Sequence, residues 1–155
     1  DEVDASAPSA VTAFNAALSN GHFAFPDGMV TRHADCCIIA GANTSGNGAT
    51  HEYVGRMKQD KAFLDRFVEI DWSLDEDLER SLTANKDWVE TVQLVRSKIK
   101  EREIKGHMVT PRATIYGSAL MAAGIDIETV KKMTLKKGLE HDAWLQISGG
   151  KRNGK

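Results

Sequence analysis

Three polar residues lie beside apolar runs, at the ends of expected strands or near the ends of expected helices: Asn43, Arg66 and Arg112. Two adjacent acids, Asp1 and Glu2, are the first residues of the sequence. Adjacent carboxylates such as Asp1 and Glu2 can divide the work of hydrolysing a phosphate bond. One carboxylate holds hydrated Mg²⁺, and the next orients or deprotonates the attacking water. Two solvated acids at a chain end are the alternative interpretation of this pair.

Asn43 directly follows residues 36–42, a compact apolar run that we expect to be a fully buried strand. A neutral amide at the carboxyl end of a strand can position a water against a phosphate without adding charge. The alternative is an asparagine favoured for its turn geometry, because Thr44, Ser45 and Gly46 follow it.

Two arginines offer positive charge for a phosphate. Arg66 lies between Asp65 and Phe67 near an expected helix end. It could reach the phosphate of a neighbouring subunit, or it could pair with Asp65 or with the helix C-terminus. Arg112 lies in the first turn of an expected helix, where a cation opposes the helix dipole. That unfavourable placement adds weight to a binding role for Arg112.

Other chemistries have weaker signals. The histidines show no metal-ligand spacing, so we expect surface or turn positions for His22, His33, His51, His107 and His141. Four lysines form a basic helix face that is expected to be solvated rather than bound to RNA: Lys131, Lys132, Lys136 and Lys137. Cys36 and Cys37 are adjacent within an apolar run, so we expect reduced core residues and a cytoplasmic location.

The composition is that of an ordinary globular protein. The chain has 155 residues, 41% of them hydrophobic and 27% charged, with a net charge of −2. This charge provides no electrostatic footprint for nucleic acid or an acidic membrane. No apolar run approaches the roughly 20 residues needed to cross a bilayer, and no secretory signal is visible. Because the chain starts at Asp1 without a methionine, we expect a cut through a larger protein.

The first half of the chain predicts an α/β unit. Apolar residues recur at helical spacing over residues 8–20, with Gly21 suited to the helix exit. Residues 22–33 alternate around Pro26-Asp27-Gly28 and predict a hairpin. After the strand at 36–42, the sequence predicts a loop at 43–50, a short helix carrying Phe63, Leu64 and Phe67, and a strand at 67–72.

The second half predicts helices. Ser73 begins a capping box, and Leu74, Leu78 and Leu82 follow at four-residue intervals. A helix over residues 86–104 places Trp88, Val92, Val95 and Ile99 on one face and stops at Gly106. Thr110 caps a further helix with Pro111 at its first position and Gly124 at its end. Asp126 caps another, with Ile127, Val130 and Met133 directed inward. We therefore expect domains at 1–72 and 73–148, and a polar tail at 149–155.

The order of these signals resembles the MoxR-like AAA+ ATPases, and within them the CobS-like branch, which is often carried by phages and named for a cobaltochelatase subunit. The resemblance covers roughly residues 1–140. The motifs that carry it are Asp1-Glu2-Val3-Asp4-Ala5-Ser6, Phe25-Pro26-Asp27-Gly28, Arg32-His33, Ala40-Gly41-Ala42-Asn43-Thr44, Tyr53-Val54-Gly55-Arg56, Leu64-Asp65-Arg66-Phe67 and Thr110-Pro111-Arg112-Ala113.

The resemblance implies a role for each site residue. Asp1 and Glu2 match the Walker B pair, with Asp1 for Mg²⁺ and Glu2 for the catalytic water. Asn43 matches sensor 1, Arg66 the arginine finger that acts on the ATP of the next subunit, and Arg112 sensor 2 in the helical lid. Arg56 matches a second possible interface arginine. The hairpin, over residues 23–31, matches an insertion that faces the pore or a client.

The implied fold is a partial AAA+ P-loop core from Walker B onward, α/β in class, followed by an all-α lid. The resemblance implies other copies as partners in a ring, a hexamer by analogy with the family, and a client or von Willebrand A-type protein. A membrane is not expected as a partner, and nucleic acid is disfavoured. The sequence departs from the family because G-x-x-x-x-G-K-[ST] does not occur in it.

Two functions remain open from the sequence. The first is the C-terminal portion of a ring-forming ATPase that uses ATP and Mg²⁺ to remodel a partner protein or to drive a chelatase-like assembly. The second is a non-catalytic, truncated AAA+ interaction module that binds no ATP of its own. Without the phosphate-binding loop, this chain alone is expected to be inactive. The isolated α/β half is also expected to be poorly stable, because its strands lack neighbours.

Overall fold

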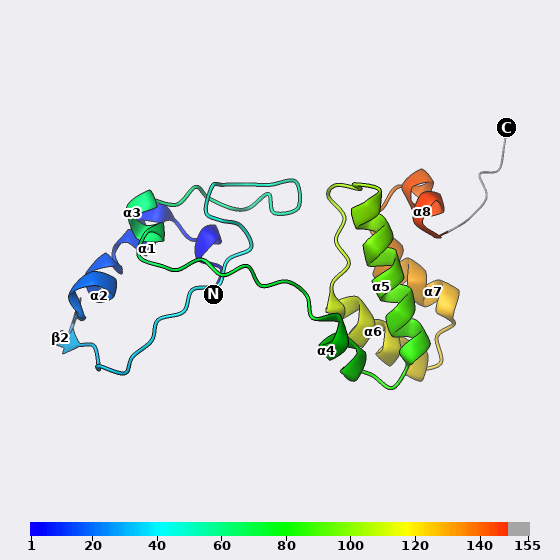
Figure 1. The fold of residues 1–155 in the computed structure, drawn as a ribbon, viewed down its shortest axis with the longest axis horizontal. Helices are drawn as coiled ribbons and strands as arrows, with labels where there is room; N and C mark the ends of the chain where they lie inside the picture. Colours follow the sequence, from blue (N-terminus) through cyan, green and yellow to red (C-terminus); the bar gives the residue numbers. More distant parts are fainter. Residues whose placement is uncertain (149–155) are drawn as a thin grey trace. The chain divides into compact units, whose positions relative to one another are not determined.

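The computed structural model describes residues 1–148, so the predicted tail at 149–155 lies outside the described residues (Figure 1). The chain divides into two compact units, Asp1–Asp71 and Trp72–Lys155. We call the first the N-terminal unit and the second the helical unit. Their assignment to an ATPase core and a lid stays a prediction.

The first helical stretch of the N-terminal unit is broken in two. The expected helix over residues 8–20 is present as α1 (Pro8–Thr12) and α2 (Asn15–Asn20), so the prediction of one continuous helix is wrong. Phe14 lies at the break with ψ of −6°, and its ring stacks on Phe23 with centroids 5.6 Å apart. This aromatic contact ties the break to the following hairpin. Gly21, with φ of 70°, ends α2 as predicted.

The predicted hairpin is confirmed. Strands β1 (His22–Phe25) and β2 (Gly28–Thr31) pair antiparallel, with Phe25 opposite Gly28 and His22 opposite Thr31. Pro26 and Asp27 form the two-residue connection. Within residues 1–148 this hairpin is the only sheet.

The strands predicted at residues 36–42 and 67–72 are wrong. Neither segment forms a strand, and neither pairs with another strand of the described chain. A lone strand leaves its backbone donors and acceptors unpaired and is not stable by itself. Their apolar side chains therefore face solvent: Ile39 is 87% exposed and Val68 is 90% exposed. Cys36 and Cys37 are free but exposed, so their prediction as core residues is also wrong.

The remaining elements of the N-terminal unit are a loop and a short helix. The loop predicted at residues 43–50 is confirmed. Helix α3 (Lys61–Leu64) begins at Asp60, whose side chain accepts hydrogen bonds from the backbone of Ala62 and Phe63. Phe63, only 3% exposed, packs against the Phe67 ring at 5.1 Å. Few residues of this unit are buried to that degree.

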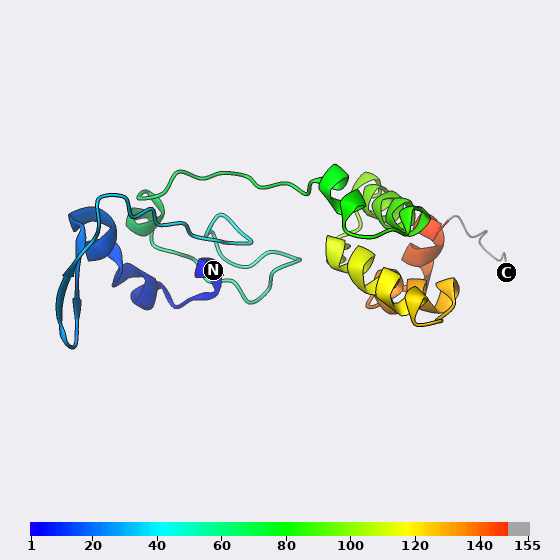
Figure 2. The same cartoon turned by 90° about the horizontal axis from the view of Figure 1, so that it is seen from below.

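The helical unit contains α4 (Glu76–Ser81), α5 (Lys86–Glu101), α6 (Pro111–Ala122), α7 (Ile127–Lys131), the π-helical turn η2 (Lys132–Lys136) and α8 (His141–Ser148). In Figure 2 the helices of this unit are coloured from green to red. The caps predicted at Thr110 and Asp126 are confirmed, since each side chain accepts from a backbone N–H of its first turn. The cap predicted at Ser73 is wrong. Asp75 caps α4 instead, accepting from Leu78 N.

One face of α5 forms the core of the helical unit. Trp88, Val92, Val95 and Ile99 are buried on it as predicted, and they pack with residues of α6, α7, η2 and α8. Ile127 and Met133 are 45% and 49% exposed, so their predicted inward position is wrong. The π turn of η2 shifts the register after Lys131 and brings Leu135 into the core at 0% exposure.

Helix α6 approaches the Trp88 ring closely. Gly117 faces the indole, and a Cβ atom there would lie 2.3 Å from Cε2 and Cζ2 of Trp88. The indole N–H donates a 3.1 Å hydrogen bond to the carbonyl of Ala113, one turn earlier on α6. A glycine is therefore required at position 117 for this packing.

A buried carboxylate attaches α4 to the rest of the helical unit. Glu79 is 1% exposed and accepts two bonds from Arg96, at 2.7 and 2.8 Å, and one from the Thr114 hydroxyl at 2.5 Å. Burial raises the pKa of the Glu79 carboxyl. The bonds from Arg96 and Thr114, together with the Arg96 charge, outweigh burial and hold the net pKa below its usual value. The leucines of α4 lie outside: Leu78 is 61% exposed.

Candidate functional site

The first five residues form an acidic turn against the loop that carries Asn43. Glu2 has φ of 54° and precedes the 3₁₀ turn η1 (Val3–Ala5). The backbone N–H of Val3 donates to the carbonyl of Gly41 at 3.0 Å, and the N–H of Met57 donates to the carbonyl of Asp4 at 2.7 Å. Three segments that are far apart in the sequence meet at this turn.

Asp4 is the centre of this meeting point. It is 0% exposed, and its Oδ2 accepts from Asn43 N at 3.1 Å, from Thr44 N at 2.9 Å and from Thr44 Oγ1 at 2.9 Å. Its Oδ1 is buried and has no hydrogen-bond partner within residues 1–148. The carboxylate thus fixes the backbone of the Asn43 loop directly.

Arg56 joins the two acids of the turn. Its Nη1 lies 3.4 Å from Glu2 Oε2, and its Nε lies 3.5 Å from Asp4 Oδ2. The hydrogen bond to Glu2 raises the pKa of the Arg56 guanidinium; burial opposes this, and the nearby charges of Asp4 and Glu2 raise it further. The guanidinium also lies 5.7 Å from the Tyr53 ring centroid, within the range of a cation–π contact. Arg56 is therefore held on several sides.

The structure brings four of the six predicted site residues together. Asp1, Glu2, Asn43 and Arg56 surround the acidic turn. Asp1 Oδ1 accepts from Glu2 N at 2.9 Å, and it lies so close to Gly41 that a Cβ there would be 2.7 Å away. The carboxylate of Asp1 itself is exposed.

The other two predicted residues lie elsewhere. Arg66 follows α3; its Nε donates to Ser19 Oγ at 2.7 Å, and its Nη1 donates to the carbonyl of Ala62 in α3. Of the two interpretations offered by the sequence, the local contact with the helix is therefore present. Arg112 is exposed in the first turn of α6 and belongs to the helical unit, whereas the acidic turn belongs to the N-terminal unit.

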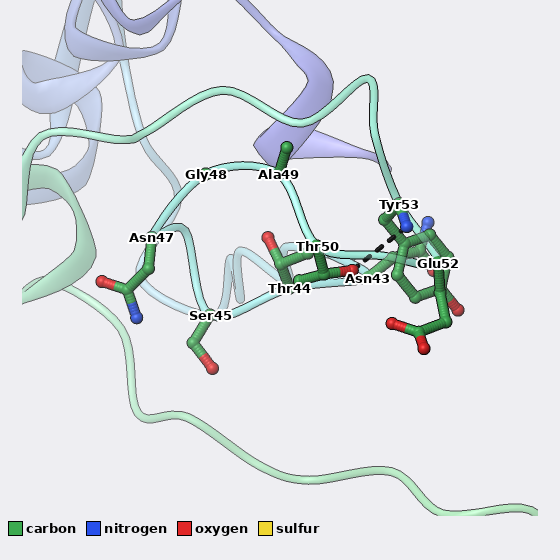
Figure 3. Close-up of a pocket in the computed structure, with 9 residues that line it drawn as sticks. All are labelled: Asn43, Thr44, Ser45, Asn47, Gly48, Ala49, Thr50, Glu52 and Tyr53. Atoms are coloured by element: carbon green, nitrogen blue, oxygen red, sulfur yellow. Dashed lines mark hydrogen bonds between the residues drawn. The ribbon is translucent and has the colours of Figure 1, made fainter. Parts of the chain in front are cut away.

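A pocket of about 410 Å³ opens beside the acidic turn (Figure 3). The lining side chains are mostly polar and uncharged, and the lining residues are Asn43, Thr44, Ser45, Asn47, Gly48, Ala49, Thr50, Glu52 and Tyr53. The loop is held closed on itself by a 3.1 Å bond from Tyr53 N to Thr50 Oγ1, drawn as a dashed line in Figure 3. Asn43 and Thr44 both line the pocket and bond to Asp4 through their backbone. The pocket and the acidic turn are thus parts of one site.

The side chains around the acidic turn suit a magnesium ion only if water and the phosphates of a nucleotide supply most of its ligands. In the part of the chain that the structure describes, no group of three or more His, Cys, Asp or Glu side chains is gathered around a metal position. Mg²⁺ in phosphoryl-transfer sites takes one or two carboxylates and fills its other positions with water and phosphate oxygens. The exposed Asp1 carboxylate, steadied by Glu2 N, meets that requirement.

Sequence reasoning missed Asp4 and Thr44. Both sit directly beside predicted residues, in Asp1-Glu2-Val3-Asp4 and in Asn43-Thr44. An acid followed by small residues gives no sign of burial by itself. The useful signal would have been Asp4 taken together with the loop at Asn43-Thr44. A buried carboxylate requires hydrogen-bond donors, and the backbone N–H groups of this loop supply them.

Comparison with protein-family models, with curated proteins and with solved structures found no match for this chain. In residues 1–148, none of the helices combines the length and apolar character that crossing a membrane requires.

Proposed function

We propose that this chain is the C-terminal portion of a ring-forming AAA+ ATPase that couples ATP hydrolysis to remodelling of a partner protein or of a chelatase-like assembly. One observation carries the proposal. The acidic turn and the Asn43 loop, about forty residues apart, are in direct contact through Val3 N–Gly41 O and through the Asp4 carboxylate. An acid pair beside a polar amide is the arrangement that hydrolysis of a phosphate bond uses.

The proposed roles follow from the positions around the turn. Mg²⁺-ATP would supply the phosphoryl group and the positive charge that balances its oxygens. Asp1 would hold the cation through its exposed carboxylate, and Glu2, 60% exposed at its side chain, would orient the attacking water. Asn43, whose backbone is fixed by Asp4, would offer its side-chain amide to the same water. The phosphate-binding loop is proposed to come from a segment outside this sequence.

The arginines are proposed to act between subunits and from the lid. Arg66 is exposed, and its bond to Ser19 Oγ holds the guanidinium at the surface of the N-terminal unit. That placement suits contact with ATP held by the next copy in a homo-oligomeric, hexameric ring. Arg112 is the proposed sensor of phosphate in the helical unit. Arg56 is proposed to hold the Glu2 carboxylate of its own chain in place. The free cysteines suit the cytoplasm, where we place the protein.

The test uses ATP hydrolysis by the protein as its gene encodes it. Replacing Glu2 by Gln or Arg66 by Ala is expected to lower kcat by about a thousandfold or more, with nucleotide binding retained. Arg32→Ala is the matched control, because Arg32 also bonds to α2, through the carbonyls of Ala17 and Leu18 at 3.3 Å. Arg32→Ala should leave kcat within about twofold of the unmodified protein.

Mixing the two inactive variants decides whether Arg66 acts in trans. Rings made from Glu2→Gln and Arg66→Ala subunits contain interfaces where an intact Glu2 meets an intact Arg66. Such mixed rings are expected to recover part of the turnover. If the mixture is as inactive as its components while Arg32→Ala is active, the trans assignment is wrong.

The alternative, a non-catalytic interaction module, is favoured by a separate observation. Helix α4 is attached through the buried Glu79, and Leu78 on this helix is 61% exposed; Leu74, before the helix, and Leu82, at its C-cap, are 49% and 45% exposed. Exposed large apolar side chains that follow one another this closely along the chain suit a docking surface. Titration with ATP separates the two functions, because an interaction module of this kind would bind no nucleotide in the presence of Mg²⁺.

A further inference from the structure

We infer that Asp4 is the positioning residue of the site: its buried carboxylate sets the location of Asn43 relative to Glu2. The structural part of this inference stands on the contacts of the chain itself. Its consequence for turnover rests on the proposed ATPase function.

Asp4 contacts all three segments of the site. Its own turn carries Glu2, its Oδ2 accepts the two backbone N–H groups of Asn43 and Thr44, and its main-chain carbonyl accepts from Met57 N. The Thr44 hydroxyl closes the loop onto the same oxygen at 2.9 Å. Removing this one side chain would take away the three bonds that hold Asn43 and Thr44 to the turn, without changing any residue proposed to touch ATP.

The chemistry of these contacts calls for a carboxylate. One oxygen collects three donors within 3.1 Å and has the Arg56 guanidinium at 3.5 Å. An ionised oxygen forms such bonds about twice as strongly as a neutral one. An amide in its place would retain one acceptor oxygen but would lose the charge that faces Arg56.

Burying the Asp4 carboxylate also costs free energy, and fixing the position of the Asn43 loop is an effect that explains this cost. The side chain is 1% exposed, and Oδ1 has no partner within the described residues. A buried acceptor without a hydrogen-bond partner destabilises the folded state, so Asp4 Oδ1 makes no favourable contribution to stability. The cost is explained if the acid holds the Asn43 loop in one place.

Arg56 extends the coupling to Glu2. A single guanidinium faces Asp4 through Nε and Glu2 through its two terminal nitrogens, at 3.4 and 3.5 Å. The guanidinium is held by Tyr53 as well. A shift of Asp4 would therefore move Arg56 and, through it, the carboxylate of Glu2. The same acid thus positions both groups that are proposed to hold the water.

The first experiment measures amide hydrogen exchange of the whole chain and needs no nucleotide. In Asp4→Asn, the N–H groups of Asn43 and Thr44 should exchange about 10- to 100-fold faster, because the acceptor that each N–H faces loses its charge. Thr44→Val removes the bond from the hydroxyl to Asp4 and the bond that this hydroxyl accepts from Gly46 N, but it leaves both backbone bonds to Asp4 in place. It should give a smaller increase in exchange, and Thr44→Ser should return exchange to the original rate. Thr50→Val, on the same loop but bonded to Tyr53, is the control and should not change the exchange of Asn43 or Thr44. Unchanged exchange in Asp4→Asn would overturn the inference.

The second experiment separates positioning from binding. In the ATP-hydrolysing protein, Thr44→Val should lower kcat about tenfold with KM for ATP unchanged, and Thr44→Ser should restore kcat. A rise in KM with constant kcat would contradict a positioning role. If the unmodified protein hydrolyses no ATP, the proposed function fails, and the exchange measurement still decides whether Asp4 fixes the loop.

Discussion

The close contact between Gly117 and Trp88 makes Gly117→Ala the most informative single substitution in the helical unit. In most helix interiors this change stabilises a protein by about 1 kcal/mol, because alanine is the better helix former. Here the added methyl would lie 2.3 Å from two indole carbons and 2.4 Å from the indole nitrogen of Trp88. Carbon atoms pack at about 3.5–4.0 Å, so the ring or α6 must move by more than an ångström.

The expected change in the free energy of unfolding follows from three terms. Overpacking a well-filled core costs about 1–3 kcal/mol. Displacing the ring, which is 1% exposed, breaks its 3.1 Å bond to the Ala113 carbonyl and leaves a buried N–H, which costs about 1–3 kcal/mol more. Subtracting the gain in helix propensity leaves a net destabilisation of about 1–5 kcal/mol.

The assay is urea denaturation followed by far-ultraviolet circular dichroism. Ala119→Gly, an exposed site on the same helix, is the control for propensity and should cost about 1 kcal/mol. In the double variant Trp88→Leu/Gly117→Ala, the alanine should no longer destabilise, which a double-mutant cycle would measure as a favourable coupling. If Gly117→Ala stabilises the protein by about 1 kcal/mol, the packing argument is refuted.

Three further predictions concern other parts of the chain. The pKa of Glu79 is lowered on folding, so its contribution to stability should be complete above about pH 5. That contribution should be lost as pH falls below about 4.3, the pKa of an unperturbed glutamate. Glu79→Gln should flatten this part of a pH–stability curve. At neutral pH, Glu79→Ala should cost about 3–5 kcal/mol in chemical denaturation, because the mostly buried Arg96 loses its two short bonds to a carboxylate and keeps only the Glu76 carboxylate at 3.7 Å and the Val109 carbonyl. Glu79→Leu combined with Arg96→Met should cost less; equal losses would contradict this reasoning. Gly46→Ala should destabilise the N-terminal unit by about 1–2 kcal/mol in hydrogen-exchange measurements, because φ there is 72° and the Leu64 methyls lie 3.0 Å from the added carbon; Gly55→Ala, with open space around it, is the control.

Local signals explain most of what the sequence predicted correctly. Asp126 and Thr110 cap their helices because each needs only a backbone N–H two or three residues away. The buried face of α5 follows from the spacing of Trp88, Val92 and Val95 alone. The hairpin needs only alternation and a tight connection. In each case the partner lies within a few residues of the signal.

The failures concern partners that are distant or missing. Residues 36–42 have a strand-like composition, but a strand forms only with a neighbour, and the described chain offers none. Met133 was placed inward on regular helical spacing, which the π turn of η2 interrupts. Asp4 is buried by donors that lie 39 and 40 residues away along the chain. No window of local sequence contains that information.

The sequence indicates which residues belong to the site more accurately than it indicates which atoms they bond to. The sequence singled out Glu2 and Arg56 separately, and the structure shows them 3.4 Å apart. It also offered Arg66 either to a neighbouring subunit or to its own helix, and the structure shows the local bond to Ala62. Whether a second contact forms in a ring depends on another copy of the chain, so the choice of trans partner stays a prediction.

The division of the chain into two units also separates its natural chromophores. All three tryptophans, Trp72, Trp88 and Trp144, fall in the helical unit, so indole emission at 295 nm excitation reports on that unit without any label. Trp88 is 1% exposed and Trp72 is 89% exposed, so their emission maxima should differ, and only the blue-shifted component should move to longer wavelength as the core opens. Tyr53 of the N-terminal unit absorbs almost nothing at 295 nm, so emission excited at this wavelength follows the helical unit alone while the N-terminal unit stays dark.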